Sequence, residues 1–337
     1  MNFTGAHIVS IDQFERPDVE AIFAVADRMQ PYALRKRVTR VLEGAILGNM
    51  FFEASTRTRI SFGSAFNLLG GEVRETAGFD NSALVKGESL QDTARVLSGF
   101  SDVICMRHPV AGSVADFALA SRVPVVSGGD GANEHPTQAL LDLYTIRKEM
   151  ADRGRSITGL KIAMIGDLRH GRTVHSLGKL LCLYTDVEVV LISPEKLSLP
   201  EAIVELMRNS SIKVTHYDDL LEGIVDVDIV YSTRIQEERF PNKREADLYR
   251  GKFRLNQAIY TEFCQPNTVI MHPMPRDSRS DANELDCDLD NNPNLAIFRQ
   301  ADNGVLVRMA LFAMVLDVVD SVDAHSHDVR WFNARQN

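Results

Sequence analysis

The chain lacks the features that mark several large classes of protein. Its four cysteines are far apart and form no CxxC pair, which indicates structural thiols in a reducing compartment rather than a disulfide scaffold. The longest strongly apolar stretch, residues 309–316, is far shorter than the roughly 20 residues that span a bilayer. We therefore expect neither a disulfide-stabilised nor a membrane-spanning protein.

Positive charge is also scarce. The chain has 37 basic and 46 acidic side chains, so its formal net charge is 37 − 46 = −9. A general nucleic-acid binder is not expected, because phosphate backbones are held by an excess of lysine and arginine. A small anionic ligand is still compatible, since local charge binds it. The first residues carry acids and no basic segment followed by an apolar core, so we expect a cytoplasmic protein without a signal peptide.

What the sequence does contain is an alternation of short apolar runs and amphipathic segments. Residues 161–165 are typical of a buried strand, and residues 172–184 place their apolar side chains on one helical stripe. Further strands are expected at 45–52, 102–106, 123–126, 187–192, 212–216, 228–231 and 268–271. This alternation predicts an α/β protein with two doubly wound domains, each a mainly parallel sheet flanked by helices.

The length of 337 residues accommodates about two domains. The polar stretch 149–158 favours a boundary near residue 150, so the expected domains are 1–150 and 151–302. The pattern alone assigns the last long helix, about 303–320, to neither domain. Residues 277–294 are expected to form a mobile polar loop.

The segment Ser55-Thr-Arg-Thr-Arg59 follows a predicted strand and begins a predicted helix. Ser55 is a good N-cap, and the first turn of a helix presents backbone N–H groups and the positive end of the helix dipole. Two hydroxyls and two guanidiniums at this position suit phosphate, because arginine forks match its oxygens. A well-capped helix with surface arginines fits the same pattern equally well.

A second polar segment surrounds His135. Pro136 holds this histidine in an extended conformation just before a predicted helix, where its imidazole could donate to a carbonyl oxygen. A structural role is the commoner explanation for a single histidine, so both interpretations stay open.

Three more polar clusters follow predicted strands, at residues 107–109, 232–236 and 272–276, and a fourth lies at 166–172. The last has neither a GxGxxG sequence nor an acidic residue at the end of the next strand, so a dinucleotide site is not expected. Basic and polar clusters at strand ends in an acidic protein indicate a deep cleft for a polyanionic substrate.

Six short segments occur in a fixed order: Ser55–Arg59, His135–Gln138, Gly166–His175, Thr233–Gln236, His272–Pro275 and Arg299–Gly304. Their order resembles that of the aspartate/ornithine carbamoyltransferase superfamily, and the resemblance covers about residues 45–317. The arginine in the GRTVHS segment and the TRxQ segment favour the aspartate-using branch. Ornithine-using members typically have an HCLP segment, whereas Pro273 follows His272 here.

The resemblance implies transfer of the carbamoyl group of carbamoyl phosphate to the amino group of L-aspartate, giving N-carbamoyl-L-aspartate and phosphate in pyrimidine biosynthesis. Carbamoyl phosphate would bind the first domain and aspartate the second, with the active site in the cleft between them. The C-terminal helix, about 303–325, would pack back on the first domain. No metal or organic cofactor is implied, because phosphate is already a leaving group, and neither nucleic acid nor membrane is an expected partner.

The resemblance also implies roles for individual residues. The catalytic residues would be Arg57, Thr58, Lys86, Arg107 and His135. Carbamoyl phosphate would be bound by Ser55, Thr56, Arg57, Thr58, Ser82, Lys86, Arg107, His135, Gln138 and the backbone carbonyls of Pro273 and Met274. Aspartate would be bound by Lys86, Arg172, Arg234 and Gln236. Ser82 and Lys86 match a loop that enters the neighbouring subunit's site, which implies a homotrimer with shared sites, with or without regulatory chains.

Three positions depart from the family pattern. Val85 stands where some members have a second lysine, Met274 replaces a common leucine, and the 277–294 segment is longer and more polar than usual. Two alternative functions stay open. One is a carbamoyltransferase for another amine such as ornithine, and the other is a non-catalytic homologue that binds phosphate compounds.

Overall fold

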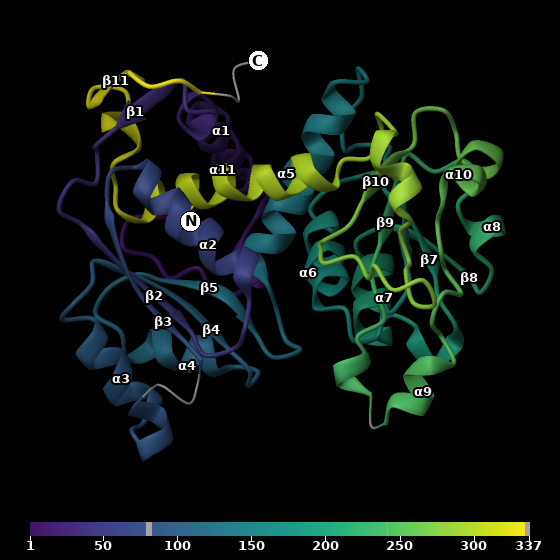
Figure 1. Ribbon diagram of the computed structural model, residues 1–337, viewed down its shortest axis with the longest axis horizontal. Helices are drawn as coiled ribbons and strands as arrows, with labels where there is room; N and C mark the ends of the chain where they lie inside the picture. Colours follow the sequence, from purple (N-terminus) through teal and green to yellow (C-terminus); the bar gives the residue numbers. More distant parts are fainter. Residues whose placement is uncertain (79–82, 241, 334–337) are drawn as a thin grey trace. The chain divides into compact units, whose positions relative to one another are not determined.

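The computed structural model describes residues 1–78, 83–240 and 242–333, and the chain divides into two compact units (Figure 1). The first unit comprises Met1–Leu140 with Asp302–Asn337, and the second comprises Leu141–Ala301. Each unit has its own parallel sheet with helices packed against it, so the prediction of two doubly wound α/β domains is confirmed.

The sheet of the first unit has four parallel strands in the order β3-β2-β4-β5. The strands are β2 (Ile46–Phe51), β3 (Glu72–Ala77), β4 (Val103–His108) and β5 (Val125–Asp130). In the register of this sheet, Phe51 lies opposite Arg107 and His108 lies opposite Asp130. The carboxyl ends of β2, β4 and β5 are therefore level at one edge of the sheet.

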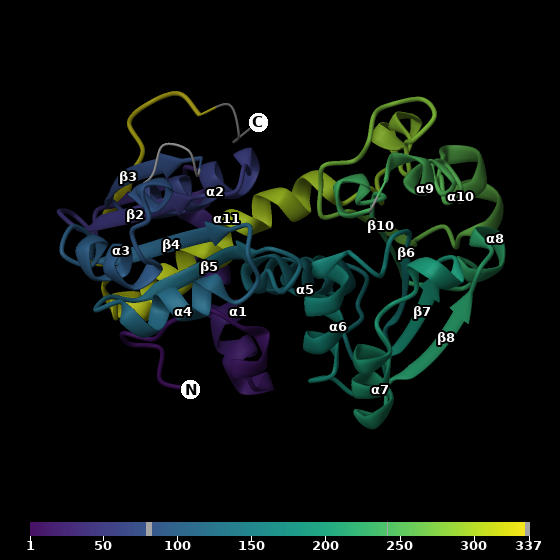
Figure 2. The same cartoon turned by 90° about the horizontal axis from the view of Figure 1, so that it is seen from below.

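Helices cover both faces of this sheet (Figure 2). On one face, Met50 and Ile104 share an apolar cluster with Phe117 of α4. On the other face, Phe66 of α2 packs edge-on against Phe312 of α11, with ring centroids 5.1 Å apart. The helices of this unit are η1 (Ile11–Gln13), α1 (Arg16–Ala33), α2 (Thr56–Leu68), η2 (Ala83–Lys86), α3 (Leu90–Leu97), α4 (Ser113–Ala120) and η6 (Val319–Ser321). A small antiparallel pair, β1 (Arg37–Thr39) with β11 (Ser326–Asp328), completes it.

The sheet of the second unit has five parallel strands in the order β10-β9-β6-β7-β8. The strands are β6 (Lys161–Ile165), β7 (Glu188–Ile192), β8 (Lys213–Tyr217), β9 (Ile229–Ser232) and β10 (Val269–Met271). Its short helices are η3 (Glu195–Leu197), α7 (Glu201–Asn209), α8 (Leu220–Gly223), η4 (Glu237–Arg239), α9 (Lys243–Asp247), α10 (Gln257–Phe263) and η5 (Cys287–Asn291). The chain order of these strands places β6, the first strand, in the middle of the sheet, beside β9.

The two faces of this sheet are packed by different segments. Ile165 and Val230 belong to an apolar cluster with Leu220 of α8 and Tyr260 of α10. On α6 (Arg172–Leu181), a Cβ atom at Gly178 would lie 2.3 Å from Met207 Cε of α7, so a larger residue there would require the end of that methionine side chain to move. Two helices contribute residues to both units: α5 (Pro136–Ala151) and α11 (Ile297–Val315).

The segment 277–294, expected as a mobile polar loop, is anchored to the core of the second unit. Leu285 and Leu289 are buried in the apolar cluster of the second unit. The Leu255 N–H donates to the Glu284 carbonyl and the Asp286 N–H donates to the Leu255 carbonyl, so the segment pairs with a neighbouring stretch of backbone. Two leucines at this spacing anchor an otherwise polar sequence.

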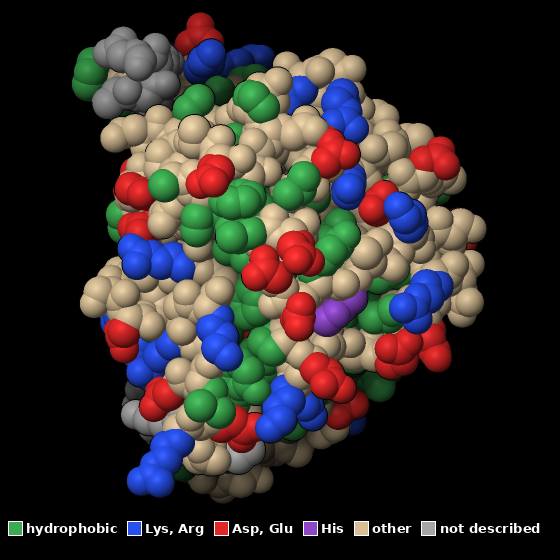
Figure 3. All heavy atoms as spheres, turned by 90° about the vertical axis from the view of Figure 1, so that its right-hand side faces the viewer, with side chains coloured by type: hydrophobic (Ala, Val, Ile, Leu, Met, Phe, Trp, Pro, Cys, Tyr) green, Lys and Arg blue, Asp and Glu red, His purple; other side chains and the backbone are tan. Residues whose placement is uncertain are grey.

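One face of the second unit mixes charged and apolar side chains (Figure 3). Acidic and basic side chains are interspersed over the face that carries α8 and α10, with apolar side chains between them (Figure 3). Among the helices of the described residues, none is both long and apolar enough to cross a bilayer.

Candidate active site

Helix α2 begins where the sequence analysis placed its start. Ser55 is the N-cap residue and has an extended backbone, but in the described structure its hydroxyl accepts no hydrogen bond from the first turn of α2. The expected side-chain cap is therefore absent. The first turn of this 13-residue helix carries Thr56, Arg57 and Thr58, and Thr56 and Arg57 are exposed. A helix start of this kind offers backbone N–H groups and positive potential to an anion.

Two further predicted residues lie at the same edge of the first sheet. Arg107 is the penultimate residue of β4 and is 8% exposed; its Nη1 donates to the Gly128 carbonyl at 3.0 Å, and its Nη2 lies 2.8 Å from Glu53 Oε2. His135 precedes α5 and accepts, through its carbonyl, the N–H of Gln138 at 3.0 Å. Because β2, β4 and β5 are neighbours, the structure brings Ser55–Thr58, Arg107 and the His135–Gln138 turn together.

Arg308 of α11 supports this edge and was not identified from the sequence. It is 4% exposed, and its Nη1 donates to Ser61 Oγ of α2 at 2.8 Å. Its guanidinium also lies 4.7 Å from the centre of the Phe62 ring, and Nη2 reaches Thr137 Oγ1 of α5 at 3.5 Å. One buried cation thus contacts the second turn of α2 and the first turn of α5.

The two residues predicted to reach a neighbouring subunit follow β3. Lys86 ends the short helix η2, and its side chain is exposed. Ser82 lies outside the described residues.

The predicted substrate-binding residues of the second unit also follow strands of its sheet. Arg172 is the first residue of α6, which follows β6; Arg234 and Gln236 follow β9; Pro273 and Met274 follow β10. These three strands are neighbours, so the second unit brings its own predicted residues to one edge of its sheet.

Asp167 links two of these loops and was missed as a site residue. Its fully buried carboxylate accepts the Gln236 N–H through Oδ2 at 3.1 Å and the His170 N–H through Oδ1 at 3.1 Å. Gly166, with φ +109°, allows the approach, because a Cβ atom there would lie 2.2 Å from the Thr233 carbonyl oxygen. An acidic residue two positions after a buried strand was the signal available in the sequence.

Ion pairs fix the loop after β9. Arg234 contacts Glu238, and although partial burial opposes ionisation of Glu238, the arginine outweighs it and lowers the pKa of that carboxyl. Glu237 accepts hydrogen bonds from Arg250 at 2.8 Å and from Arg279 at 2.6 Å, which lower its pKa. The loop is therefore held by ion pairs of its own carboxylates, Glu237 and Glu238. Arg250 and Arg279, from two other segments, pair with Glu237.

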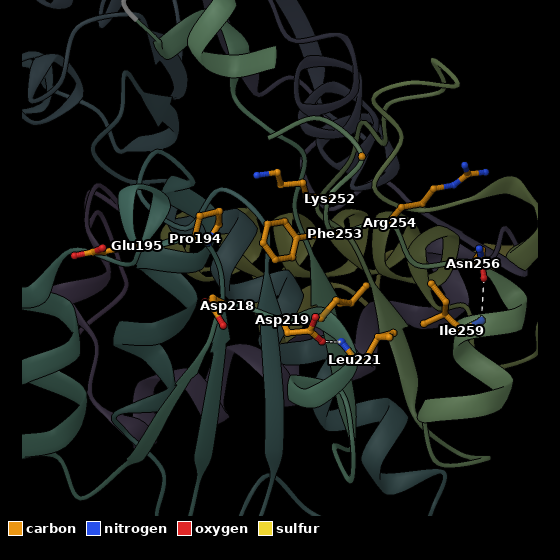
Figure 4. Close-up of a pocket in the computed structure, with 12 residues that line it drawn as sticks. Pro194, Glu195, Asp218, Asp219, Leu221, Lys252, Phe253, Arg254, Asn256 and Ile259 are labelled. Carbon is orange, nitrogen blue, oxygen red and sulfur yellow. Dashed lines mark hydrogen bonds between the residues drawn. The ribbon is translucent and has the colours of Figure 1, made fainter. Parts of the chain in front are cut away.

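A cavity of about 620 Å³ lies elsewhere in the second unit (Figure 4). Its walls come from the segments after β7 and β8 and from residues 251–259, with Phe253 facing Pro194 and Asp218. Asp219 caps α8 and Arg254 pairs with Asp286, so two of its charged groups already have protein partners. The residues that line this cavity include none of the predicted site residues.

Comparison with known proteins agrees with the motifs. A model of the aspartate/ornithine carbamoyltransferase carbamoyl-P binding domain matches residues 6–148, and a model of the Asp/Orn binding domain matches residues 158–315. The chain belongs to the aspartate/ornithine carbamoyltransferase family, so the resemblance stated above is confirmed.

The relatives specify the branch of that family. The aspartate carbamoyltransferase catalytic subunits of Saccharophagus degradans and Cellvibrio japonicus are each 73% identical to this chain, over 99% of both chains. Among solved structures, aspartate transcarbamoylase from Trypanosoma cruzi in complex with N-(phosphonacetyl)-L-aspartic acid has a TM-score of 0.85 and 36% identity, covering 93% of this chain and 97% of that one. The catalytic subunit from M. jannaschii has a TM-score of 0.82 and 40% identity, covering 94% and 99%.

Proposed function

We propose that this chain transfers the carbamoyl group of carbamoyl phosphate to the amino group of L-aspartate, giving N-carbamoyl-L-aspartate and phosphate, a step of pyrimidine biosynthesis. The observation that carries the proposal is the 73% identity, over 99% of both chains, to aspartate carbamoyltransferase catalytic subunits. The placement of the motif residues at two sheet edges supports it.

In this proposal, the first unit binds carbamoyl phosphate. The start of α2, with Ser55, Thr56, Arg57 and Thr58, receives the phosphate, since N–H groups and arginine forks both match its oxygens. Arg107 gives up its contact with Glu53 to bind the same substrate. His135 and Gln138 contact the carbamoyl group, and Ser82 and Lys86 reach the substrates from a neighbouring subunit.

The second unit supplies the groups that bind aspartate. Arg172, Arg234 and Gln236 hold the two carboxylates, and an incoming carboxylate replaces Glu238 as the partner of Arg234. The carbonyls of Pro273 and Met274 accept hydrogen bonds from amino groups of the substrates.

The reaction then needs no redox step and no added group. The neutral amine of aspartate attacks the carbonyl carbon of carbamoyl phosphate, the C–O bond to phosphate breaks, and the departing phosphate takes up the proton that the amine loses. Thr58, Arg107 and His135 stabilise the negative charge that develops on the carbonyl oxygen. Holding both substrates in position contributes about 7–11 kcal/mol in favourable intramolecular reactions.

The test of the function is an assay of the purified chain with carbamoyl phosphate and one amino acid at a time. We expect carbamoyl aspartate and an equal amount of phosphate from aspartate, and no turnover of ornithine. Turnover of ornithine alone would support the other branch of the family. Phosphate binding without turnover of either amino acid would support a non-catalytic homologue.

We further propose that the chain forms a homotrimer whose sites are shared between subunits. Lys86 supports this proposal, because its exposed side chain lies on a segment that the family resemblance assigns to a neighbour's site. Arg57→Ala and Lys86→Ala chains should each be nearly inactive alone. Mixed trimers should regain activity, since one site would then combine an intact Arg57 with an intact Lys86. No recovery in verified mixed trimers would refute shared sites. Association with regulatory chains stays a prediction.

A further inference from the structure

A chain of buried polar side chains lies behind the Pro273–Met274 turn of the second unit. Its members come from four elements: Tyr231 on β9, Asp142 on α5, Gln300 on α11 and His272 directly after β10. Each is at most 1% exposed. Burying a carboxylate and three other polar side chains is costly unless they are hydrogen-bonded, so their arrangement needs an explanation beyond core packing.

The hydrogen bonds of this chain converge on Asp142. Asp142 accepts from the Tyr231 hydroxyl at 2.6 Å and from Gln300 Nε2 at 2.6 Å. Gln300 Oε1 in turn accepts the backbone N–H of His272 at 2.9 Å. Because an ionised carboxylate only accepts hydrogen bonds, Asp142 fixes which way the Gln300 amide points. The amide oxygen is thereby held facing the His272 backbone.

The imidazole of His272 continues the chain to the turn. Its Nδ1 accepts the Met274 N–H at 2.8 Å, which requires the ring proton to be on Nε2. Nε2 lies 2.7 Å from Glu284 Oε1, a close contact without the alignment of a hydrogen bond. Glu284 also accepts the Asp277 N–H at 3.1 Å, so it ties the following residues to the same point.

Met274 has an unusual backbone conformation. Its φ is +59°, in the left-handed region that residues with a Cβ atom rarely adopt. Such a conformation persists only where the surroundings hold it, and it is commonest at ligand-binding positions. The bond from the Met274 N–H to His272 Nδ1 is a restraint of this kind. Without it, the carbonyls of Pro273 and Met274 would lose their fixed direction.

We propose that His272, held through Gln300 by Asp142, is a positioning residue that aims the Pro273 and Met274 carbonyls at the amino groups of the substrates. The proposal rests on the proposed function, in which those two carbonyls accept hydrogen bonds from substrate. His272 itself touches no substrate. Its Nδ1 acts on the turn, and the buried network sets the position of its backbone.

Two substitutions of His272 distinguish a role in positioning the Pro273–Met274 turn from a role in core packing. The side-chain oxygen of His272→Asn can take the place of Nδ1 and accept the Met274 N–H, whereas that of His272→Gln reaches only the place of Nε2. We expect kcat/KM for aspartate to fall about 10-fold or more in His272→Gln, as for loss of a buried hydrogen bond, and to be largely retained in His272→Asn. The KM for carbamoyl phosphate should rise as well, because the same two carbonyls are assigned to its amino group. Tyr231→Phe is the control at the far end of the network, with a smaller expected effect.

A spectroscopic measurement tests the same contact without any substitution. In the ¹⁵N spectrum of the full-length wild-type chain, the His272 ring should show the Nε2–H tautomer, with Nδ1 as an acceptor. A ring protonated on Nδ1 would overturn the proposal. Equal losses in the Asn and Gln variants, with normal wild-type activity and unchanged melting temperatures, would also overturn it while leaving the proposed function intact. An inactive wild-type chain would refute the proposed function and the positioning role with it.

Discussion

The loop before α2 and the loop after β9 hold their predicted residues in different ways. Residues 52–55 lead directly into the 13-residue helix α2, whose first turn carries Thr56, Arg57 and Thr58 and determines where they lie. Residues 233–236 lead only into the three-residue helix η4 (Glu237–Arg239), and carboxylates hold this loop instead. Asp167 accepts the Gln236 N–H, and Glu238 contacts Arg234.

This difference predicts where each loop is vulnerable to mutation. In the loop before α2, the residues that face the substrate can be changed without loss of support, because regular helical hydrogen bonds maintain the loop. In the loop after β9, a residue that never touches substrate can be as important as one that does. The predictions below test this contrast from the largest expected effect to the smallest.

The largest effect is expected for Arg57→Ala. Arg57 is exposed at the start of α2, so its removal should leave the melting temperature nearly unchanged while kcat falls by about 100-fold or more. Initial rates at saturating substrates and a thermal melt would check both. Arg40→Ala, which removes an equally charged exposed side chain paired with Glu43, is the matched control and should retain full activity. Near-normal kcat in Arg57→Ala would contradict the phosphate role of this helix start.

A smaller but still large effect is expected for Asp167→Asn. The carboxylate of Asp167 accepts one backbone N–H at each oxygen, from His170 and from Gln236. The asparagine amide has only one oxygen, so its NH₂ group would face one of these two N–H donors and leave it without an acceptor. An unsatisfied buried pair costs about 1–3 kcal/mol, so kcat/KM for aspartate should fall by roughly 10- to 100-fold. Rates measured against aspartate concentration, at saturating carbamoyl phosphate, would show it.

The control for this substitution lies at the end of β8, at the same edge of the same sheet. Asp219 accepts the N–H groups of Leu221 and Glu222 as the N-cap of α8, and asparagine caps helices about as well as aspartate. Asp219→Asn should therefore change kcat/KM by less than about twofold. Equal effects at Asp167 and Asp219 would remove the special role assigned to the loop after β9.

Several buried strands were predicted to start within a residue of their observed positions. The prediction for 161–165 matches β6, and β7 and β9 start within a residue of their predicted positions. A strand that is buried on both faces has a continuous run of apolar residues, which is easy to identify in a sequence. The prediction missed β3, whose sequence EVRETA is largely exposed at the sheet edge. Helix α11 starts at Ile297 rather than near 303, since the helix continues through Asn303 and Gly304.

The residues of the candidate site also divide into those that the sequence identified and those that it did not. Motifs identified the cations and hydroxyls, which stand at helix starts and strand ends where linear sequence predicts position. They did not identify Asp142 or Gln300, because each lies inside a helix and its partner is distant in sequence. Asp142 does interrupt an apolar stretch of α5, but nothing in the sequence shows that its oxygens face Tyr231 and Gln300.

The smallest effect concerns the pH dependence of stability, which again separates the two units. Burial lowers the pKa of His7 and His108 in the first unit and of His175 in the second. A histidine whose pKa is lowered on folding binds fewer protons in the native state than in the unfolded state. Its stabilising contribution is therefore complete above the unfolded pKa, about 6.5, and is lost as the pH falls below that value toward the folded pKa.

The geometry of these three rings makes the first unit the more sensitive one. His7 Nδ1 accepts the Val125 N–H at 3.0 Å, and His108 Nδ1 accepts the Val110 N–H at 3.1 Å, so protonation destroys both bonds. His175 Nε2 instead faces the Leu168 carbonyl at 2.8 Å and stays a donor when the ring is charged. Between pH 7.5 and 5.5, the urea midpoint should decrease, and His7→Asn with His108→Asn should flatten that decrease more than His175→Gln does. The lowered pKa values of Asp277 and Glu237 act only below about pH 4.5, so this window isolates the histidines. A larger flattening from His175→Gln would show that burial, rather than the loss of backbone hydrogen bonds, governs how acid destabilises the chain.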